Sequence, residues 1–237
     1  MKLKNKVIIV TGATSSIGKQ LVKDLASNGA ILILLGRKRN DLEKEKNELK
    51  QLGSDTYIYT ADLTNSTELY KVASQIIKFN KSIDAIVNLA GFWHNEKQHF
   101  FGIPIEKFPD QVIEITMDLL KGIVLLNKRI ISKLNANATI IAVSGSFSQN
   151  EKGVLAEYVH KKGIENLIQQ LHFDLNERGI RTYAIAPWYV WTKYVQKFWP
   201  KIRSECLTVE EVSKKIIEIL MERPRNLSGK VIKMKPK

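Results

Sequence analysis

The sequence predicts an α/β fold in which a doubly wound parallel sheet of about seven strands carries helices on both faces. Short apolar runs alternate with longer amphipathic ones along the whole chain. Most of the short runs are apolar at successive positions, as expected for strands that are covered on both faces. Strands that alternate with helices in this way favour a parallel sheet. The expected strands span residues 7–10, 31–35, 57–60, 85–90, 139–143, 182–186 and 230–234.

Helix-length segments separate the expected strands, for example residues 17–29, 41–53 and 209–223. Another helix is expected from about Tyr158, because the apolar residues after it recur at helical spacing and Gly179 provides a plausible C-terminal cap. No linker, repeat or low-complexity tract marks a domain boundary. Residues 1–237 are therefore expected to form one domain, with a substrate-loop segment at about 188–207.

The composition is that of a globular protein, because 44% of the 237 residues are hydrophobic and 26% are charged. No apolar run approaches the ~18 residues of a membrane span, and the first apolar run is too short for a signal peptide. A cytoplasmic location is therefore expected. The single cysteine, Cys206, cannot form an internal disulfide, and no Cys/His cluster has the spacing of metal ligands, so no metal is expected.

The formal net charge of +13 raises the question of nucleic-acid binding, because Lys and Arg contacts to phosphates supply most non-specific affinity. The basic residues are scattered, however. In residues 38–50 acids alternate with bases, as they do on solvated helix faces. This pattern argues against a nucleic-acid partner. The positive surplus would also attract an anionic cofactor or substrate.

The first expected strand leads through a glycine-containing turn into a helix, the context in which a Rossmann-type fold binds a dinucleotide. Gly12 would allow the turn and Gly18 would allow close helix packing, while the N–H groups at the helix start suit a pyrophosphate. One expected glycine is missing, since Ser15 and Ser16 occupy the candidate positions. A serine hydroxyl could compensate by hydrogen bonding. The alternative is an ordinary turn between a strand and a helix.

The end of the second expected strand indicates which dinucleotide is preferred. Gly36 is followed by Arg37, Lys38 and Arg39, where an acidic residue would instead bind an unmodified ribose. Such a cationic pocket suits a 2'-phosphate and favours NADP(H) over NAD(H). The alternative is a solvated basic loop that opens the next helix.

Five motifs occur along the chain in the order and spacing of a known family. They are "TGATSSIG" from Thr11, "DLT" from Asp62, "NLAG" from Asn88, "YVHKK" from Tyr158 and "PWYVWT" from Pro187. With them the chain resembles the short-chain dehydrogenase/reductase family over essentially its whole length, and its compact oxidoreductase branch in particular.

The resemblance implies a set of cofactor contacts. Asp62 and Leu63 would flank the adenine, and Val190 and Thr192 would hold the nicotinamide carboxamide. Asp62 could equally be a turn residue, and Asn88 a hydrogen-bonded residue at the end of a strand. The full set is Gly12, Thr14, Ser15, Ser16, Ile17, Gly18, Arg37, Asp62, Leu63, Asn88, Ala90, Gly91, Tyr158, Lys162, Pro187, Val190 and Thr192.

Tyr158 and Lys162 are the predicted acid/base pair. Residues four apart on a helix lie one above the other, which Tyr189 and Lys193, in an irregular aromatic stretch, would not. An ammonium about 5 Å from a phenol favours the phenolate by roughly 3 kcal/mol at an effective dielectric of about 20. The resemblance implies that the tyrosine exchanges a proton with the substrate while the lysine also binds the nicotinamide ribose.

Three positions depart from the family pattern. The serine expected thirteen residues before Tyr158 is replaced by Gly145, so that Ser146, or failing that Ser144, would polarise the substrate carbonyl. Leu119 replaces an asparagine, and Trp188 replaces a glycine. The leading hypothesis is an NADP(H)-dependent oxidoreductase that interconverts a carbonyl and a secondary alcohol. The alternative is a dinucleotide-binding protein of the same fold that catalyses little and acts as a sensor or partner subunit.

The substrate end of the chain is less informative. Aromatic residues in segments 91–104 and 188–200 suggest a bulky or apolar substrate, but equally a subunit interface or a lid that packs on itself. His94 and His99 are interpreted as loop histidines and not as catalytic ones. The resemblance implies a homo-tetramer or homo-dimer.

Overall fold

Seven parallel strands form one sheet in the order β3-β2-β1-β4-β5-β6-β7. The computed structural model describes residues 3–91, 103–146 and 154–236. Every expected strand is present, which confirms the predicted fold class. The strands are β1 (Val7–Thr11), β2 (Ile31–Gly36), β3 (Thr56–Thr60), β4 (Ile83–Asn88), β5 (Leu134–Val143), β6 (Arg181–Pro187) and β7 (Val231–Met234).

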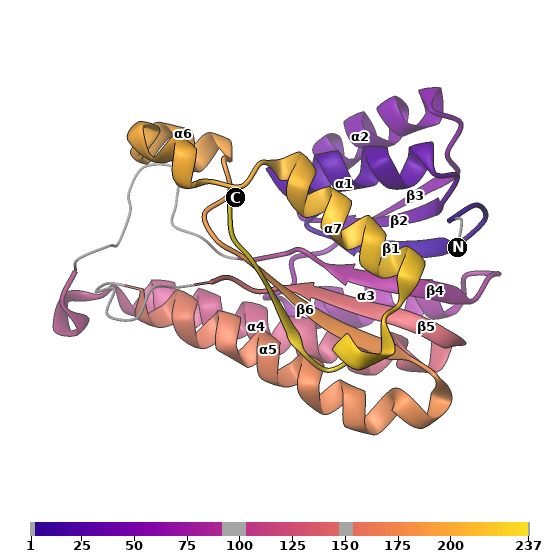
Figure 1. The fold of residues 1–237 in the computed structure, drawn as a ribbon. Coiled ribbons are helices and arrows are strands. Elements are labelled where there is room, and N and C mark those ends of the chain that lie inside the picture. The colour runs from indigo at the N-terminus through magenta and orange to yellow at the C-terminus, as the bar shows by residue number, and fades with distance from the viewer. Residues whose placement is uncertain (1–2, 92–102, 147–153, 237) are drawn as a thin grey trace.

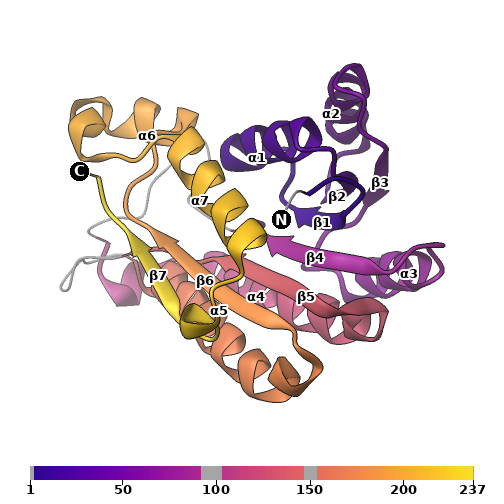
Figure 2. The same cartoon turned by 45° about the vertical axis from the view of Figure 1, so that its right-hand side comes forward.

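Helices cover both faces of this sheet (Figures 1 and 2). One layer contains α1, α2 and α7, and the other contains α3, α4 and α5. The short α6 lies beyond the carboxyl ends of the strands. The helices are α1 (Ser16–Ser27), α2 (Arg39–Gln51), α3 (Ser66–Ile77), α4 (Asp110–Ile130), α5 (Leu155–Leu175), α6 (Lys193–Phe198) and α7 (Val209–Glu222).

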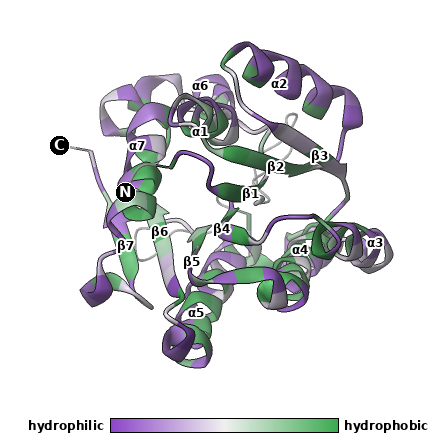
Figure 3. Cartoon of the chain, turned by 90° about the vertical axis from the view of Figure 1, so that its right-hand side faces the viewer, coloured by the Kyte–Doolittle hydropathy of each residue, from purple (hydrophilic) through white to green (hydrophobic). Residues whose placement is uncertain are grey.

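The apolar core is divided by the sheet into two clusters. Along β1, Val7 and Ile9 belong to the cluster under α3, α4 and α5, whereas Ile8 and Val10 belong to the cluster under α1, α2 and α7. Successive side chains of a strand point to opposite faces, so a strand between two helical layers must be apolar throughout. Figure 3 shows the same pattern as green strands inside helices whose outer faces are purple.

Some element boundaries differ from the sequence-based expectation. β5 begins at Leu134, because its pairing with β4 starts there and then shifts register before Thr139. α5 begins at Leu155, three residues before Tyr158, and ends at Leu175. A 3-10 turn over Asn176–Arg178 follows, and Gly179, with φ of 75°, caps this turn and not α5 itself. The expected substrate-loop segment contains a short helix, α6, which is too brief for periodicity to reveal.

β1 lies between β2 and β4, so the order of the strands reverses at β1. The loops that leave β1 and β4 therefore lead to opposite faces of the sheet, and ligands of such folds bind in the crevice between them. Within the described residues, no helix is both long and apolar enough to cross a membrane. Most of segment 91–104, including His94 and His99, lies outside the described residues.

Candidate active site

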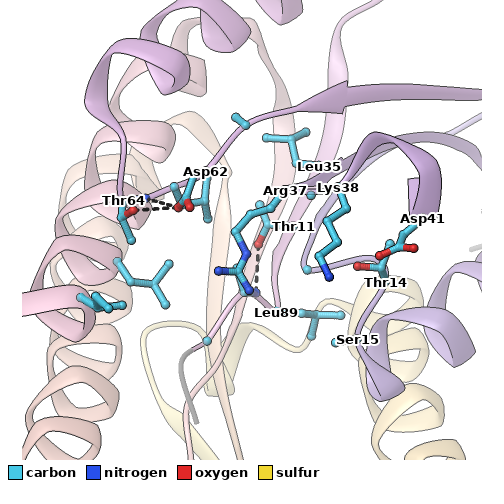
Figure 4. Close-up of a pocket in the computed structure, with 18 residues that line it drawn as sticks. Thr11, Thr14, Ser15, Leu35, Arg37, Lys38, Asp41, Asp62, Thr64 and Leu89 are labelled. Atoms are coloured by element: carbon cyan, nitrogen blue, oxygen red, sulfur yellow. Dashed lines mark hydrogen bonds between the residues drawn. The ribbon is translucent and has the colours of Figure 1, made fainter. Parts of the chain in front are cut away.

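A pocket of about 440 Å³ lies at the carboxyl ends of the first four strands (Figure 4). This is the crevice that the strand order predicts. It is lined by Thr11, Gly12, Thr14, Ser15, Leu35, Gly36, Arg37, Lys38, Asp41, Ala61, Asp62, Leu63, Thr64, Leu89, Ala90, Gly91, Ile115 and Leu119. The lining thus includes predicted cofactor residues from the first turn, the second strand, the "DLT" segment and the "NLAG" segment.

The turn after β1 depends on its two glycines. Gly12 has φ of 66°, and a Cβ there would lie 2.8 Å from the backbone nitrogen of Ala90. A Cβ on Gly18 would collide with the carbonyl oxygen of Gly12. The roles predicted for these two residues, a tight turn and close helix packing, are therefore the roles they have.

Ser15 stands where the backbone of a glycine would otherwise approach a ligand. Its hydroxyl is the N-cap of α1, because Oγ accepts a hydrogen bond of 3.0 Å from the N–H of Gly18. Ser16 and Ile17 form the first turn of the helix. The predicted compensation by a serine hydroxyl thus takes the form of helix capping, and the positive end of the α1 dipole points at the pocket.

The rim of the pocket near β2 carries opposite charges. Figure 4 shows Arg37 and Lys38 extending into the pocket, with Asp62 to one side of them and Asp41 to the other. Arg37 and Lys38 were predicted from the sequence, whereas Asp41 was not. The sequence did contain a signal for Asp41, because it lies in the first turn of the helix that directly follows β2.

Asp62 is a turn residue, one of the two interpretations that the sequence left open, and it also lines the pocket. Its Oδ1 accepts hydrogen bonds from the backbone N–H and the hydroxyl of Thr64, at 2.9 and 2.8 Å (Figure 4). The turn therefore fixes the carboxylate at the pocket wall. The next residue, Leu63, packs its carbonyl against Gly122 of α4, where a Cβ would collide with it.

Asn88 lies beneath the pocket and does not line it. Its side chain is 1% exposed, and its Nδ2 lies 3.4 Å from both Asn127 Oδ1 and the carbonyl oxygen of Ile141. The alternative interpretation, a hydrogen-bonded residue at the end of a strand, describes this geometry. The following loop is held at β1, because the N–H of Ala90 donates to the Thr11 hydroxyl at 3.1 Å.

Tyr158 and Lys162 lie on the outer flank of α5. The Lys162 ammonium is 5.8 Å from the centroid of the Tyr158 ring, so the two groups are neighbours as predicted. Tyr158 is 45% exposed, however, and Lys162 Nζ forms an ion pair of 2.7 Å with Glu165. Neither residue lines the pocket.

The preceding residues on α5 are Glu157, which is buried, and Lys161, which is half-buried and faces the sheet. Glu157 is 6% exposed, and Lys161 Nζ donates to the carbonyl oxygen of Val143 at 3.4 Å. The same Nζ lies 3.1 Å from the position that a Cβ on Gly91 would occupy, which places it at the pocket wall. Burial lowers the pKa of Lys161, and the Glu157 carboxylate opposes that shift.

Sequence reasoning missed this second pair although a signal was present. The predicted buried face of the helix runs through Ile164 and Ile168. Lys161 is three residues before Ile164, and Glu157 is seven before it, which are positions of the same face.

The two candidate serines engage neighbouring groups. Ser146 donates its hydroxyl proton to the carbonyl oxygen of Ala186 at 2.7 Å. Ser144 is 3% exposed and donates to Glu165 Oε1 at 3.1 Å. In this geometry Ser146 would have to release Ala186 before its proton could polarise a substrate carbonyl.

The segment after β6 leads into α6. The Thr192 hydroxyl caps α6 by accepting from the N–H of Val195 at 3.4 Å, and Val190 pairs with Leu207 in an isolated bridge. Pro187, Val190 and Thr192 are not among the residues that line the pocket. In α6, burial raises the pKa of Tyr194, and the Glu157 carboxylate raises it further.

Comparisons with known proteins agree with the fold and identify the family. A family model described as short chain dehydrogenase matches residues 6–203. The 3-oxoacyl-(acyl-carrier-protein) reductase of Thermotoga maritima is 25% identical over 244 residues, which cover 98% of this chain and 97% of that protein. The 7alpha-hydroxysteroid dehydrogenase of Escherichia coli is 26% identical over 188 residues, or 79% and 72% of the two chains. The very-long-chain 3-oxoacyl-CoA reductase of Anas platyrhynchos is 26% identical, but the match spans only 60% of that enzyme.

Solved structures share the fold at low sequence identity. A short chain dehydrogenase from Burkholderia cenocepacia in complex with NADP superposes with a TM-score of 0.88 at 17% identity, covering 99% of this chain and 98% of its own. L-sorbose reductase from Gluconobacter frateurii, complexed with NADPH and L-sorbose, gives 0.84 at 18% identity, with 99% and 97% covered. An NADH-dependent reductase responsible for alginate metabolism gives 0.81 at 21% identity, with 98% and 96% covered.

Proposed function

Because the chain belongs to the short-chain dehydrogenase family, we propose that it is an NADP(H)-dependent oxidoreductase that interconverts a carbonyl and a secondary alcohol by hydride transfer. The observation that carries the choice of cofactor is the placement of Arg37 and Lys38 at the rim of a pocket whose floor is the start of α1. The family itself supports oxidoreduction.

The described residues fit a dinucleotide. A Cβ on residue 12 would fill the space against Ala90, so the turn after β1 keeps this space open only because residue 12 is glycine. The α1 N-terminus would bind the pyrophosphate, Arg37 and Lys38 the 2'-phosphate, and Asp62 with Leu63 the adenine. Ala90 and Gly91 would lie along the ribose. When bound, the dinucleotide supplies the hydride.

The preference for the 2'-phosphate can be tested by binding. We expect NADPH to bind the full chain more tightly than NADH, as followed by quenching of tryptophan fluorescence. Arg37→Glu should weaken NADPH binding at least about tenfold, since it removes a charge-assisted hydrogen bond and adds a repulsive charge, and should leave NADH binding within about threefold. Asp41→Asn is the matched control and should strengthen NADPH binding. Tighter binding of NADH by the unaltered chain would overturn the preference.

The proton of the reaction would be exchanged by a group near the N-terminus of α5. Tyr158 with Lys162 is the sequence-based candidate, and Ser146 is the candidate for polarising the carbonyl; both stay predictions. Turnover can be measured by following NADPH absorbance with ketones, aldehydes, 3-oxoacyl thioesters and hydroxysteroids. The relatives that act on long acyl chains and on steroids support a bulky or apolar substrate.

A second candidate function is a dinucleotide-binding protein that catalyses little and acts as a sensor or partner subunit. The hydrogen bond from Ser146 to Ala186 favours it, because that hydroxyl proton is engaged away from the pocket. Nucleotide binding without turnover on the whole carbonyl panel would support this alternative.

A homo-dimer or homo-tetramer in the cytoplasm remains part of the proposal, and light scattering would measure the subunit number.

A further inference from the structure

Two acid/base candidates lie side by side on α5, and their surroundings differ. Tyr158 is half exposed, and the lysine beside it is paired with Glu165. Glu157 and Lys161 are rotated by about 100° around the helix axis, the angle between successive residues. Glu157 is buried, and the half-buried Lys161 reaches the carbonyl oxygen of Val143 in β5. A group that exchanges a proton with a bound substrate must lie inside the site.

The pair lies on the side of α5 that faces the cofactor pocket. Lys161 Nζ lies at Gly91, in the wall of the dinucleotide pocket. Glu157 lies one helical turn before Lys161, on the face of α5 that is buried. The Glu157 carboxylate also raises the pKa of Tyr194, which belongs to α6 in the predicted substrate-loop segment.

Two further facts indicate more than a structural role. Burying two charges costs several kcal/mol per ion unless they interact well, and an apolar pair would hold α5 on the sheet at least as firmly. The same helix face already has Ile164 and Ile168 for that purpose. Two described titratable groups interact electrostatically with the pair. Burial and Lys161 lower the pKa of His160 on α5, and burial and Glu157 raise the pKa of Tyr194 on α6.

We propose, resting on the oxidoreductase function above, that Glu157 and Lys161 are the proton-exchanging pair of this protein, with Lys161 at the cofactor loop and Glu157 toward the substrate. In reduction the carbonyl carbon gains the hydride, its oxygen takes one proton from the pair through the Glu157 carboxyl, and water restores that proton afterwards. In oxidation the Glu157 carboxylate accepts the proton of the alcohol. The buried pair loses one positive charge as the dinucleotide gains one, so the net charge of the site is unchanged.

The proposal predicts how many protons are released when a nucleotide binds, and this number can be measured without a substrate. Calorimetric titrations of the full chain at neutral pH, in two buffers with different heats of ionisation, give the protons released on binding NADP+ and on binding NADPH. We expect more protons to be released with NADP+, because its positive ring would lie near Lys161, which is at the pocket wall. The 2'-phosphate is common to both ligands, so it cancels in the difference.

Glu157→Gln should remove this difference, because Lys161 then lacks the carboxylate that opposes the lowering of its pKa. Glu165→Gln, at a second buried glutamate of α5, is the matched control and should keep it. The double variant Glu157→Gln/Lys161→Met leaves no buried unpaired charge, and it should also lose the difference if the single variant folds poorly by circular dichroism. With a carbonyl substrate, Glu157→Gln should lower kcat by at least about 100-fold, and Glu157→Asp should restore part of it.

The outcomes separate this proposal from the function on which it rests. If neither nucleotide binds, the oxidoreductase function fails and the pair fails with it. If both bind but Glu157→Gln leaves the proton difference unchanged, only the pair is overturned. The same holds if Tyr158→Phe removes the difference while Glu157→Gln keeps it, because the exposed phenol is then the proton-exchanging group.

Discussion

At the scale of single residues, function depends on which way a side chain faces and not only on its spacing. The spacing of four residues places Tyr158 beside Lys162 and Glu157 beside Lys161 equally well. The two pairs are offset by one residue and therefore face different sides of the helix. Tyr158 is exposed and Lys162 pairs with Glu165, whereas Lys161 lies at Gly91. A tyrosine with a lysine one turn later is therefore insufficient evidence for an acid/base pair unless the helix phase is known.

Ser15 provides a prediction at the same scale. Ser15→Ala removes the N-cap of α1 and leaves the N–H of Gly18 without its acceptor, so the free energy of unfolding should fall by about 1 kcal/mol. Ser15→Gly should cost only a few tenths of a kcal/mol, because glycine is tolerated at this cap position. Urea unfolding of the nucleotide-free chain measures both. Equal losses for the two variants would show that the hydroxyl is not the stabilising group.

At the scale of elements, α4 is held against two different neighbours by glycines. Gly122 brings α4 against the backbone of Leu63, which lines the pocket, and Gly163 of α5 lies against the side chain of Leu120. A backbone carbonyl cannot move without displacing the pocket wall. A leucine side chain can adopt another rotamer.

Alanine at these two positions should therefore have unequal effects. Gly122→Ala should lower the free energy of unfolding by about 1–3 kcal/mol or more, and should weaken nucleotide binding, since the displaced segment includes Leu63. Gly163→Ala should be close to neutral, because the gain of about 1 kcal/mol in helix propensity offsets the movement of Leu120. Urea denaturation and fluorescence titration of both variants test this order, and a larger loss for Gly163→Ala would contradict it.

At the scale of the whole molecule, the sheet was predictable and the assembly of the site was only partly so. Strands such as β1 are apolar on both faces, and such short apolar runs predict strands that lie between two layers of helices. The start of β5 was missed because Asn135 and Asn137 are polar and the pairing shifts there. Pocket residues such as Gly12 and Arg37 follow a strand directly, so local sequence places them. The orientation of α5 depends on packing against β5 and β6, although its apolar face at Ile164 already indicated Lys161.

The stability of the whole molecule should depend on pH through His160. Its ring is fully buried, Nδ1 lies 3.1 Å from the carbonyl oxygen of Thr116 on α4, and burial lowers its pKa to about 4 from an ordinary value of 6.5. Between these two values the unfolded chain binds the proton and the folded chain does not, so stability falls as the pH falls. The contribution lost by pH 4 should be about 3 kcal/mol. Urea unfolding at pH 7.5 and pH 4.5 should show this loss in the unaltered chain. In His160→Asn, whose amide can still donate to Thr116 but does not titrate, the pH dependence should be shallower by about that amount; an equal slope in both chains would show that His160 is not the group responsible.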